Sequence, residues 1–218
     1  MLAIVDRRAW FDLQNQLIER VHLSWLPHFA PELCLRARGT VSGRRWLANQ
    51  LSRTCSSLFG LPPESGPVCA RDLHRSEWLA VLLRDPLECA LDLGSLVFAT
   101  TVRTAVTRPL VSRFRAALGG ARYERVLRAP QANFAASSPG LGATQASGTS
   151  GEIIDVLTRR GAHELAAYSA QVHGALGESV KFCFECNWWD HIAAPVLSPA
   201  VAESCLRLRS PDRAEIER

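Results

Sequence analysis

The sequence has very little lysine and no long apolar run. Lys181 is the only lysine among 25 basic residues, so arginine carries almost all of the positive charge. A net charge of +4 over 218 residues is too small to indicate nucleic-acid binding. The longest apolar stretch, LGSLVFATTV at 93–102, is well short of the roughly 20 residues that a membrane-spanning helix needs. We therefore expect neither a nucleic-acid partner nor a membrane span.

The sequence also has few features of an exported protein. Asp6, Arg7 and Arg8 interrupt the N-terminal apolar segment that a cleaved signal peptide would need. The seven cysteines are spread irregularly, unlike the dense even sets of small secreted disulfide proteins. These features predict a protein of the reducing cytoplasm.

Helices are expected almost throughout. Apolar residues between the glycines and prolines recur at spacings of three and four rather than two, which predicts an all-α, compact multi-helix bundle. We expect a helical core domain at 1–128, a flexible linker or loop at 129–150, and a C-terminal helical segment at 151–218 that packs on the core. The Ala/Ser/Gly-rich composition of 131–150 indicates the linker. The sequence leaves open whether the two helical parts form one unit or two subdomains.

The clearest helix signal is DPLECALDLGSLVFATTVRTAV at 85–106. Asp85 is a good N-cap and Pro86 suits the first helical position. This helix is apolar around most of its circumference, so we expect it at the centre of the fold. Further helices are expected at 43–59, at 108–118 with Thr107 as its N-cap, and at 178–190. Two more are expected between them, one that begins with Ser150 as its N-cap and one that begins after Gly161.

The stretch FCFECNWWDH at 182–191 has ligand types that zinc accepts, namely Cys183, Cys186 and His191. A closed structural site needs a fourth ligand, and no second Cys-x-x-Cys or His pair is present. A redox pair would need a strand and a parallel sheet before the motif. The aromatic residues around both cysteines instead favour a core helix. A metal site at these three residues remains the alternative.

The segment RTAVTRPLVSRFRAALGGARYERVLR at 103–128 contains seven arginines and one glutamate. Arg108 and Arg115 fall on one helical stripe, which Arg122 extends. This stripe is either a solvated face or a surface for an acidic protein partner. Nucleic acid is not expected, because the segment lacks interleaved aromatic residues.

Motifs of known enzyme classes are absent. The sequence has no His-Glu-x-x-His, Gly-x-Ser-x-Gly, phosphate-binding or dinucleotide-binding motif, and its six histidines are scattered. His22 and His28 are expected to pack or cap rather than catalyse. We predict no catalytic residue, no cofactor and no enzymatic activity.

The order of several features resembles a known family. LSWLPHF at 23–29 is followed by a tryptophan-containing helix, by a proline loop before DLHRSEWLAVLL at 72–83, and by LGSLVFATTVRTAVTRPLVSRFRAALG at 93–119. Over 23–128 the chain resembles the SctK (YscK-like) accessory proteins of type III secretion systems, and within them the plant-associated and rhizobial, NolU-like branch.

The resemblance implies a non-enzymatic adaptor at the cytoplasmic face of the secretion apparatus. Such proteins bridge the cytoplasmic domain of the SctD-type inner-membrane ring protein to the SctQ-type cytoplasmic-ring protein in the sorting platform. Because tryptophan and arginine are favoured at interfaces, the candidate partner-binding residues are Arg108, Arg115, Arg122 and Trp25. The alternative is a small helical metal-binding or nucleic-acid-binding regulatory module that uses Cys183, Cys186 and His191.

Overall fold

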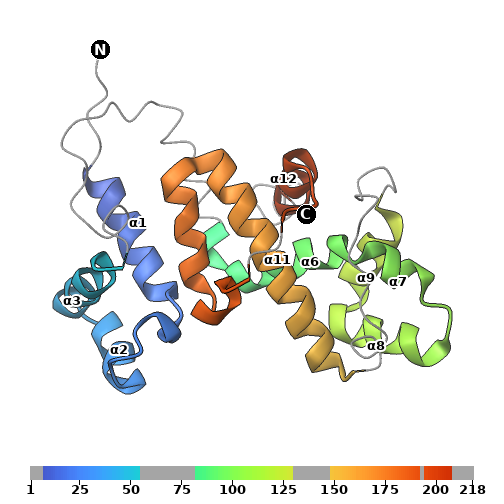
Figure 1. The fold of residues 1–218 in the computed structure, drawn as a ribbon, viewed down its shortest axis with the longest axis horizontal. Coiled ribbons are helices and arrows are strands. Elements are labelled where there is room, and N and C mark those ends of the chain that lie inside the picture. Colours follow the sequence, from blue (N-terminus) through green and yellow to red (C-terminus); the bar gives the residue numbers. More distant parts are fainter. Residues whose placement is uncertain (1–6, 55–81, 130–147, 192–193, 208–218) are drawn as a thin grey trace, which may run out of the picture. The chain divides into compact units, whose positions relative to one another are not determined.

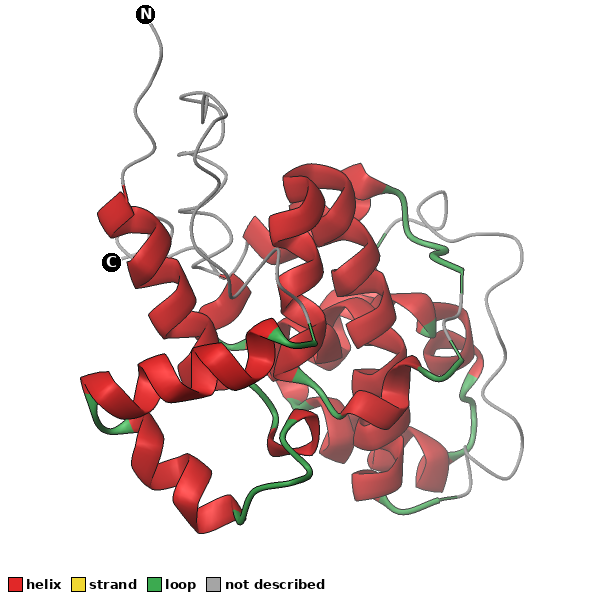
Figure 2. Ribbon diagram, turned by 60° about the vertical axis from the view of Figure 1, so that its left-hand side comes forward, coloured by secondary structure: helices red, strands yellow, loops and turns green. Residues whose placement is uncertain are grey.

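The protein is helical wherever the structure describes it. The computed structural model describes residues 7–54, 82–129, 148–191 and 194–207. Within these ranges every regular element is an α-helix or a 3-10 helix, and there is no strand (Figure 2). The all-α prediction is confirmed.

Residues 7–54 form four elements: α1 (Arg7–Arg20), the 3-10 helix η1 (Leu23–Trp25), α2 (Pro31–Arg38) and α3 (Val41–Ser52) (Figure 1). The His22 side chain caps η1 by accepting a hydrogen bond from Ser24 N, a capping role that the sequence predicted. Thr40 Oγ1 caps α3, because it accepts from Gly43 N at 3.0 Å. α3 ends at Ser52, so the prediction of a helix reaching residue 59 was wrong at its C-terminal end.

The central apolar segment forms two helices, α6 (Pro86–Val97) and α7 (Ala99–Thr104), rather than the single predicted one. Asp85 Oδ1 accepts from Glu88 N at 3.4 Å and caps α6 as expected. Most side chains of α6 are buried, which confirms its central position. The helices separate at Phe98, whose backbone has left the α conformation.

The arginine-rich segment forms a helical hairpin of α8 (Arg108–Leu118) and α9 (Gly120–Arg128). Gly119 joins them with a φ of 73°, a conformation that favours glycine. Thr107 lies at the N-cap position of α8, but its side chain makes no capping hydrogen bond. Arg103 closes the end of α9, since its Nε and Nη2 donate to Val126 O at 3.2 and 3.0 Å.

The C-terminal part contains α11 (Ser150–His173), the 3-10 helices η3 (Gly174–Cys183) and η4 (Cys186–Trp189), and α12 (Pro199–Arg207). The predicted cap at Ser150 was wrong by one residue. Thr149 is the cap, and it forms a reciprocal pair with Glu152: Glu152 Oε2 accepts from Thr149 N at 2.6 Å, and Thr149 Oγ1 accepts from Glu152 N at 3.3 Å. These bonds favour the charged carboxylate, so the pKa of Glu152 is lowered.

Gly161 does not end a helix, although the sequence predicted a break there. α11 runs through it, because Gly161 serves a close helix crossing instead. A Cβ at Gly161 would lie 1.7 Å from Ala90 O, and one at Gly94 would lie 1.8 Å from Leu157 O. The backbones of α6 and α11 therefore touch through two glycines, one from each helix.

Two compact units make up the chain. One contains residues 1–84 and 169–191, and the other contains residues 85–168 and 192–218. The predicted division at 1–128, 129–150 and 151–218 differs from this one, since each unit combines segments from both sides of the predicted linker. Most of that linker lies outside the described residues.

Each unit has its own apolar interior. The buried side chains of the first unit include Leu17, Ile18, Val21, Leu47, Leu51, Val180, Phe182 and Phe184. Those of the second include Leu93, Val97, Phe98, Phe114, Leu118, Val126, Ile153, Leu157, Leu165 and Leu206. Within the second unit α12 packs on α6, and α9 packs on both α6 and α7.

Candidate protein-binding surface

The cysteine stretch at 182–191 is buried at Phe182, Cys183, Phe184 and Trp188, reaches the surface at its C-terminal end, and is not one α-helix. η3 ends at Cys183 and η4 begins at Cys186, so the predicted helix at 178–190 was wrong in its type and continuity. Three hydrogen bonds connect the cysteine stretch to residues of η1 and to its cap His22. Phe182 O accepts from His22 N at 2.7 Å, Phe184 O accepts from Trp25 Nε1 at 2.8 Å, and Cys186 N donates to Ser24 Oγ at 2.8 Å.

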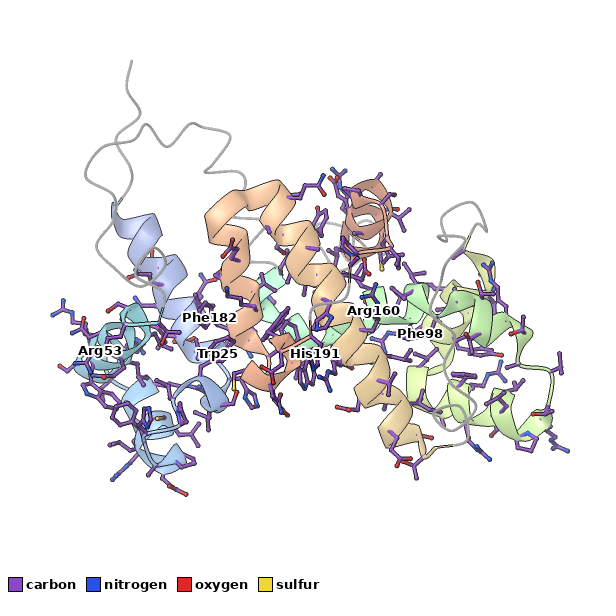
Figure 3. The ribbon with its side chains drawn as sticks, in the orientation of Figure 1. Trp25, Arg53, Phe98, Arg160, Phe182 and His191 are labelled. Atoms are coloured by element: carbon purple, nitrogen blue, oxygen red, sulfur yellow. The ribbon has the colours of Figure 1, made fainter. Side chains whose placement is uncertain are left out.

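Aromatic rings surround these bonds. The Trp25 ring lies 4.6 Å from that of Phe182, and Figure 3 shows the two side chains side by side. Phe184 stacks on Trp188 at 5.8 Å. Trp25, a predicted partner-binding residue, is half-buried and committed to contacts within its own unit. Its side chain therefore contributes to packing within the first unit rather than to an exposed binding surface.

The three candidate metal ligands do not come together. Cys183 is buried, Cys186 is half-buried and His191 is exposed. No three His, Cys, Asp or Glu side chains in the described ranges are grouped so that they could hold a metal ion. The buried aromatic surroundings of Cys183 agree with the predicted core role of this stretch.

Burial also makes Cys183 a poor metal ligand. Desolvation raises the pKa of its thiol to about 12, against a smaller opposing effect from the charge of Arg20. Metals bind the thiolate, and this thiol stays protonated near neutral pH. The pKa of Cys183 is higher in the folded protein than in the unfolded chain. Its protonated thiol therefore contributes to folding stability below the unfolded pKa, and this contribution to stability is lost as the pH rises toward 12.

We therefore expect Cys183 to resist alkylation in the native protein at about pH 8, where an unperturbed thiol reacts readily. The half-buried Cys186 should be labelled by iodoacetamide under the same conditions. Peptide mass spectrometry measures both positions, and labelling in urea provides the fully reactive control. Native labelling of Cys183 as fast as that of Cys186 would contradict its burial.

Of the three arginines predicted to bind a partner in 103–128, two are exposed and one is largely buried. Arg108 is exposed, and the Arg115 side chain is 60% exposed. Arg122 is only 12% exposed, and its guanidinium binds Asp92 and Glu88, both at 2.5 Å. The prediction that Arg122 extends the surface of Arg108 and Arg115 does not agree with this burial, because Arg122 turns inward toward α6.

Arg122 belongs to an internal ion-pair network of the second unit. The Asp92 side chain is 1% exposed and also pairs with Arg125 at 3.5 Å. Burial lowers the pKa of Arg122, but the hydrogen bonds and charges of Asp92 and Glu88 outweigh it, and the net shift is upward. This network connects α9 to α6, and no local pattern in the sequence pairs these distant charges.

The exposed charged group that remains on the hairpin was only partly predicted. Glu124 Oε1 pairs with Arg115 Nη2 at 3.3 Å, and Glu124 Oε2 pairs with Arg128 Nη2 at 3.7 Å. Arg128 is 82% exposed and was not among the predicted residues. Arg128 follows the predicted Arg122 by six residues on the same helix. It comes beside Arg115 because the chain turns at Gly119, between α8 and α9.

Comparison with protein-family models, with curated proteins and with solved structures found no match to this chain. The helices described for residues 7–54, 82–129, 148–191 and 194–207 include none with the length and apolar character to cross a membrane. This agrees with the absence of a membrane span that the sequence predicted.

Proposed function

We propose that this protein is a non-enzymatic adaptor of a bacterial type III secretion system. It would bridge the SctD-type inner-membrane ring protein to the SctQ-type cytoplasmic-ring protein, at the cytoplasmic face of the apparatus. The observation that carries the proposal is the order of sequence features over 23–128, which resembles the SctK-like accessory proteins.

Two structural features support an adaptor. The chain forms two helical units, each with its own apolar interior, as suits a protein that contacts more than one partner. The α8–α9 hairpin presents Arg108, Arg115 and Arg128 to solvent, and arginine is favoured at protein interfaces because it pairs well with carboxylates.

Affinity co-purification tests the proposal. The tagged chain, expressed in its native cells under secretion-inducing conditions, should recover both the SctD-type and the SctQ-type protein after nuclease treatment. Recovery of neither protein, or of nucleic acid and zinc in their place, would refute the adaptor role.

Charge reversal of the exposed arginines provides a second test. Replacing Arg108 and Arg115 by glutamate should reduce the recovered partner by about tenfold and leave the helical circular dichroism unchanged, because both side chains are exposed. Arg159→Glu, at an exposed position of α11, is the control for a change of charge. Full recovery with the double variant would remove this hairpin from the interface.

A further inference from the structure

The exposed group on the α8–α9 hairpin has more positive than negative charge. Two guanidinium groups, of Arg115 and Arg128, share the single carboxylate of Glu124. A guanidinium has five N–H donors and a carboxylate has about four acceptor sites, so the two arginines retain donors that Glu124 does not use. Their side chains are 60% and 82% exposed, which leaves these donors open to solvent.

The hairpin holds this group in place. The Arg115 guanidinium lies 5.7 Å from the ring centre of Tyr123, which is itself buried. Glu124 binds both arginines at once, and Arg103 closes the end of α9 next to Arg128. Side chains that are already restrained lose less conformational entropy when a partner binds.

We propose that Arg115, Glu124 and Arg128 form a docking site for an acidic segment of a protein partner, in which carboxylates of the partner bind the two guanidinium groups. The partner chemistry follows from charge complementarity, since each guanidinium can bind a carboxylate through two parallel hydrogen bonds. Glu124 competes with the incoming carboxylates and so limits the affinity. The exposed apolar side chain of Leu127 belongs to α9, as Glu124 and Arg128 do, and suits a protein surface.

A protein segment fits this surface better than a nucleic acid does. Single-stranded nucleic acids use exposed aromatic rings for stacking, whereas both aromatic residues of the hairpin, Phe114 and Tyr123, are buried. The net charge of the whole chain is only +4.

The inference deepens the proposed adaptor role and rests on it for the biological identity of the partner. The two can fail separately. Binding of an acidic peptide measures the chemistry of the site, whereas co-purification measures the assembly in which the chain works.

The test uses the full chain and a synthetic probe. The probe is a fluorescent, alanine-rich peptide of about 20 residues, long enough to form a helix, with glutamate at positions i and i+4 along one face. A peptide with glutamine at the same positions is the uncharged control. Fluorescence anisotropy at low salt and at about 0.15 M salt gives the affinities, since exposed charges are screened at the higher salt.

The glutamate peptide should bind more tightly than the glutamine peptide. Arg115→Glu and Arg128→Glu should each weaken its binding about fivefold, and Arg159→Glu, with the same change of net charge, should change it less than twofold. Glu124→Gln should strengthen binding about two- to fivefold, because it removes the competing negative charge while the glutamine carbonyl oxygen still accepts hydrogen bonds from the arginines. A merely structural role for the group would produce no such gain.

Three results would overturn the proposal. Equal binding of the two peptides would exclude carboxylate recognition. Equal losses of peptide affinity in Arg159→Glu and Arg115→Glu would show that the peptide is attracted by the overall charge of the chain and not by this site. Tighter binding of heparin or duplex DNA than of the glutamate peptide, through the same two arginines, would assign the surface to a polyanion. Circular dichroism of each variant establishes that its helices are intact.

Discussion

Replacing Gly161 by alanine is expected to destabilise the protein by about 2 to 3 kcal/mol, although alanine normally favours a helix. A Cβ at this position would lie 1.7 Å from Ala90 O, which is backbone and cannot rotate away. α6 and α11 would have to separate, and the side chains packed around their crossing would lose contacts. Urea unfolding followed by circular dichroism measures the loss.

The same helix provides a matched control. Gly151 lies in the first turn of α11, and a Cβ there would approach only the Thr149 side chain, at 3.9 Å. Gly151→Ala should therefore leave stability unchanged or raise it by up to about 1 kcal/mol. Equal stability of the two variants would show that the helices do not cross at Gly161. Gly94→Ala should resemble Gly161→Ala, since its Cβ would lie 1.8 Å from Leu157 O.

Replacing Glu164 by alanine is expected to cost about 3 to 5 kcal/mol, the range for breaking a buried ion pair from one side. Glu164 and Arg160 pair at 2.5 Å with side chains 1% and 9% exposed, and Figure 3 shows Arg160 on α11. The Glu164 carboxylate also accepts from Val196 N at 3.0 Å and from Leu197 N at 3.1 Å. The variant would leave a buried guanidinium and two backbone N–H groups without this acceptor.

Two further variants separate the causes of that loss. Glu203 on α12 pairs with Arg207 on the surface, where the side chains are 41% and 70% exposed, so Glu203→Ala should cost at most about 0.5 kcal/mol. Replacing Arg160 by Met together with Glu164 by Leu removes both charges and should recover part of the stability. The backbone N–H groups would still lack an acceptor. A Glu164→Ala variant as stable as Glu203→Ala would mean that the pair is open to water.

Local signals in the sequence predicted the helices well. The apolar spacing predicted the all-α class, and Asp85 predicted the start of α6, because both depend on residues close together along the chain. The errors have physical causes of longer range. Gly161 suggested a break, but the approach of α6 makes glycine necessary inside α11. Ser150 was predicted as the cap of α11, but Thr149 is the cap, since it forms a capping box with Glu152 three residues later.

The site was harder to predict than the fold. A helical stripe linked Arg108, Arg115 and Arg122, but such a stripe assumes one straight helix. The turn at Gly119 reverses the chain, so Arg122 reaches Asp92 and Glu88 while Arg128 comes beside Arg115. Ion pairs between residues about 30 positions apart leave no local pattern. The cysteine stretch was predicted to be core from its aromatic residues alone, and its division into two 3-10 helices had no comparable signal.

The first unit is built from two pieces of chain that leave the ribosome at different times. Its N-terminal piece ends at residue 84, and its second piece, which supplies Phe182 and Phe184, begins at residue 169. At typical translation rates the first piece waits on the order of ten seconds for its partner. During this interval α1 lacks η3, the segment of the second piece that packs on it in the finished protein. Synthesis therefore passes through a stage at which apolar side chains of the nascent N-terminal helices are exposed and prone to aggregation, and completion of the chain ends it.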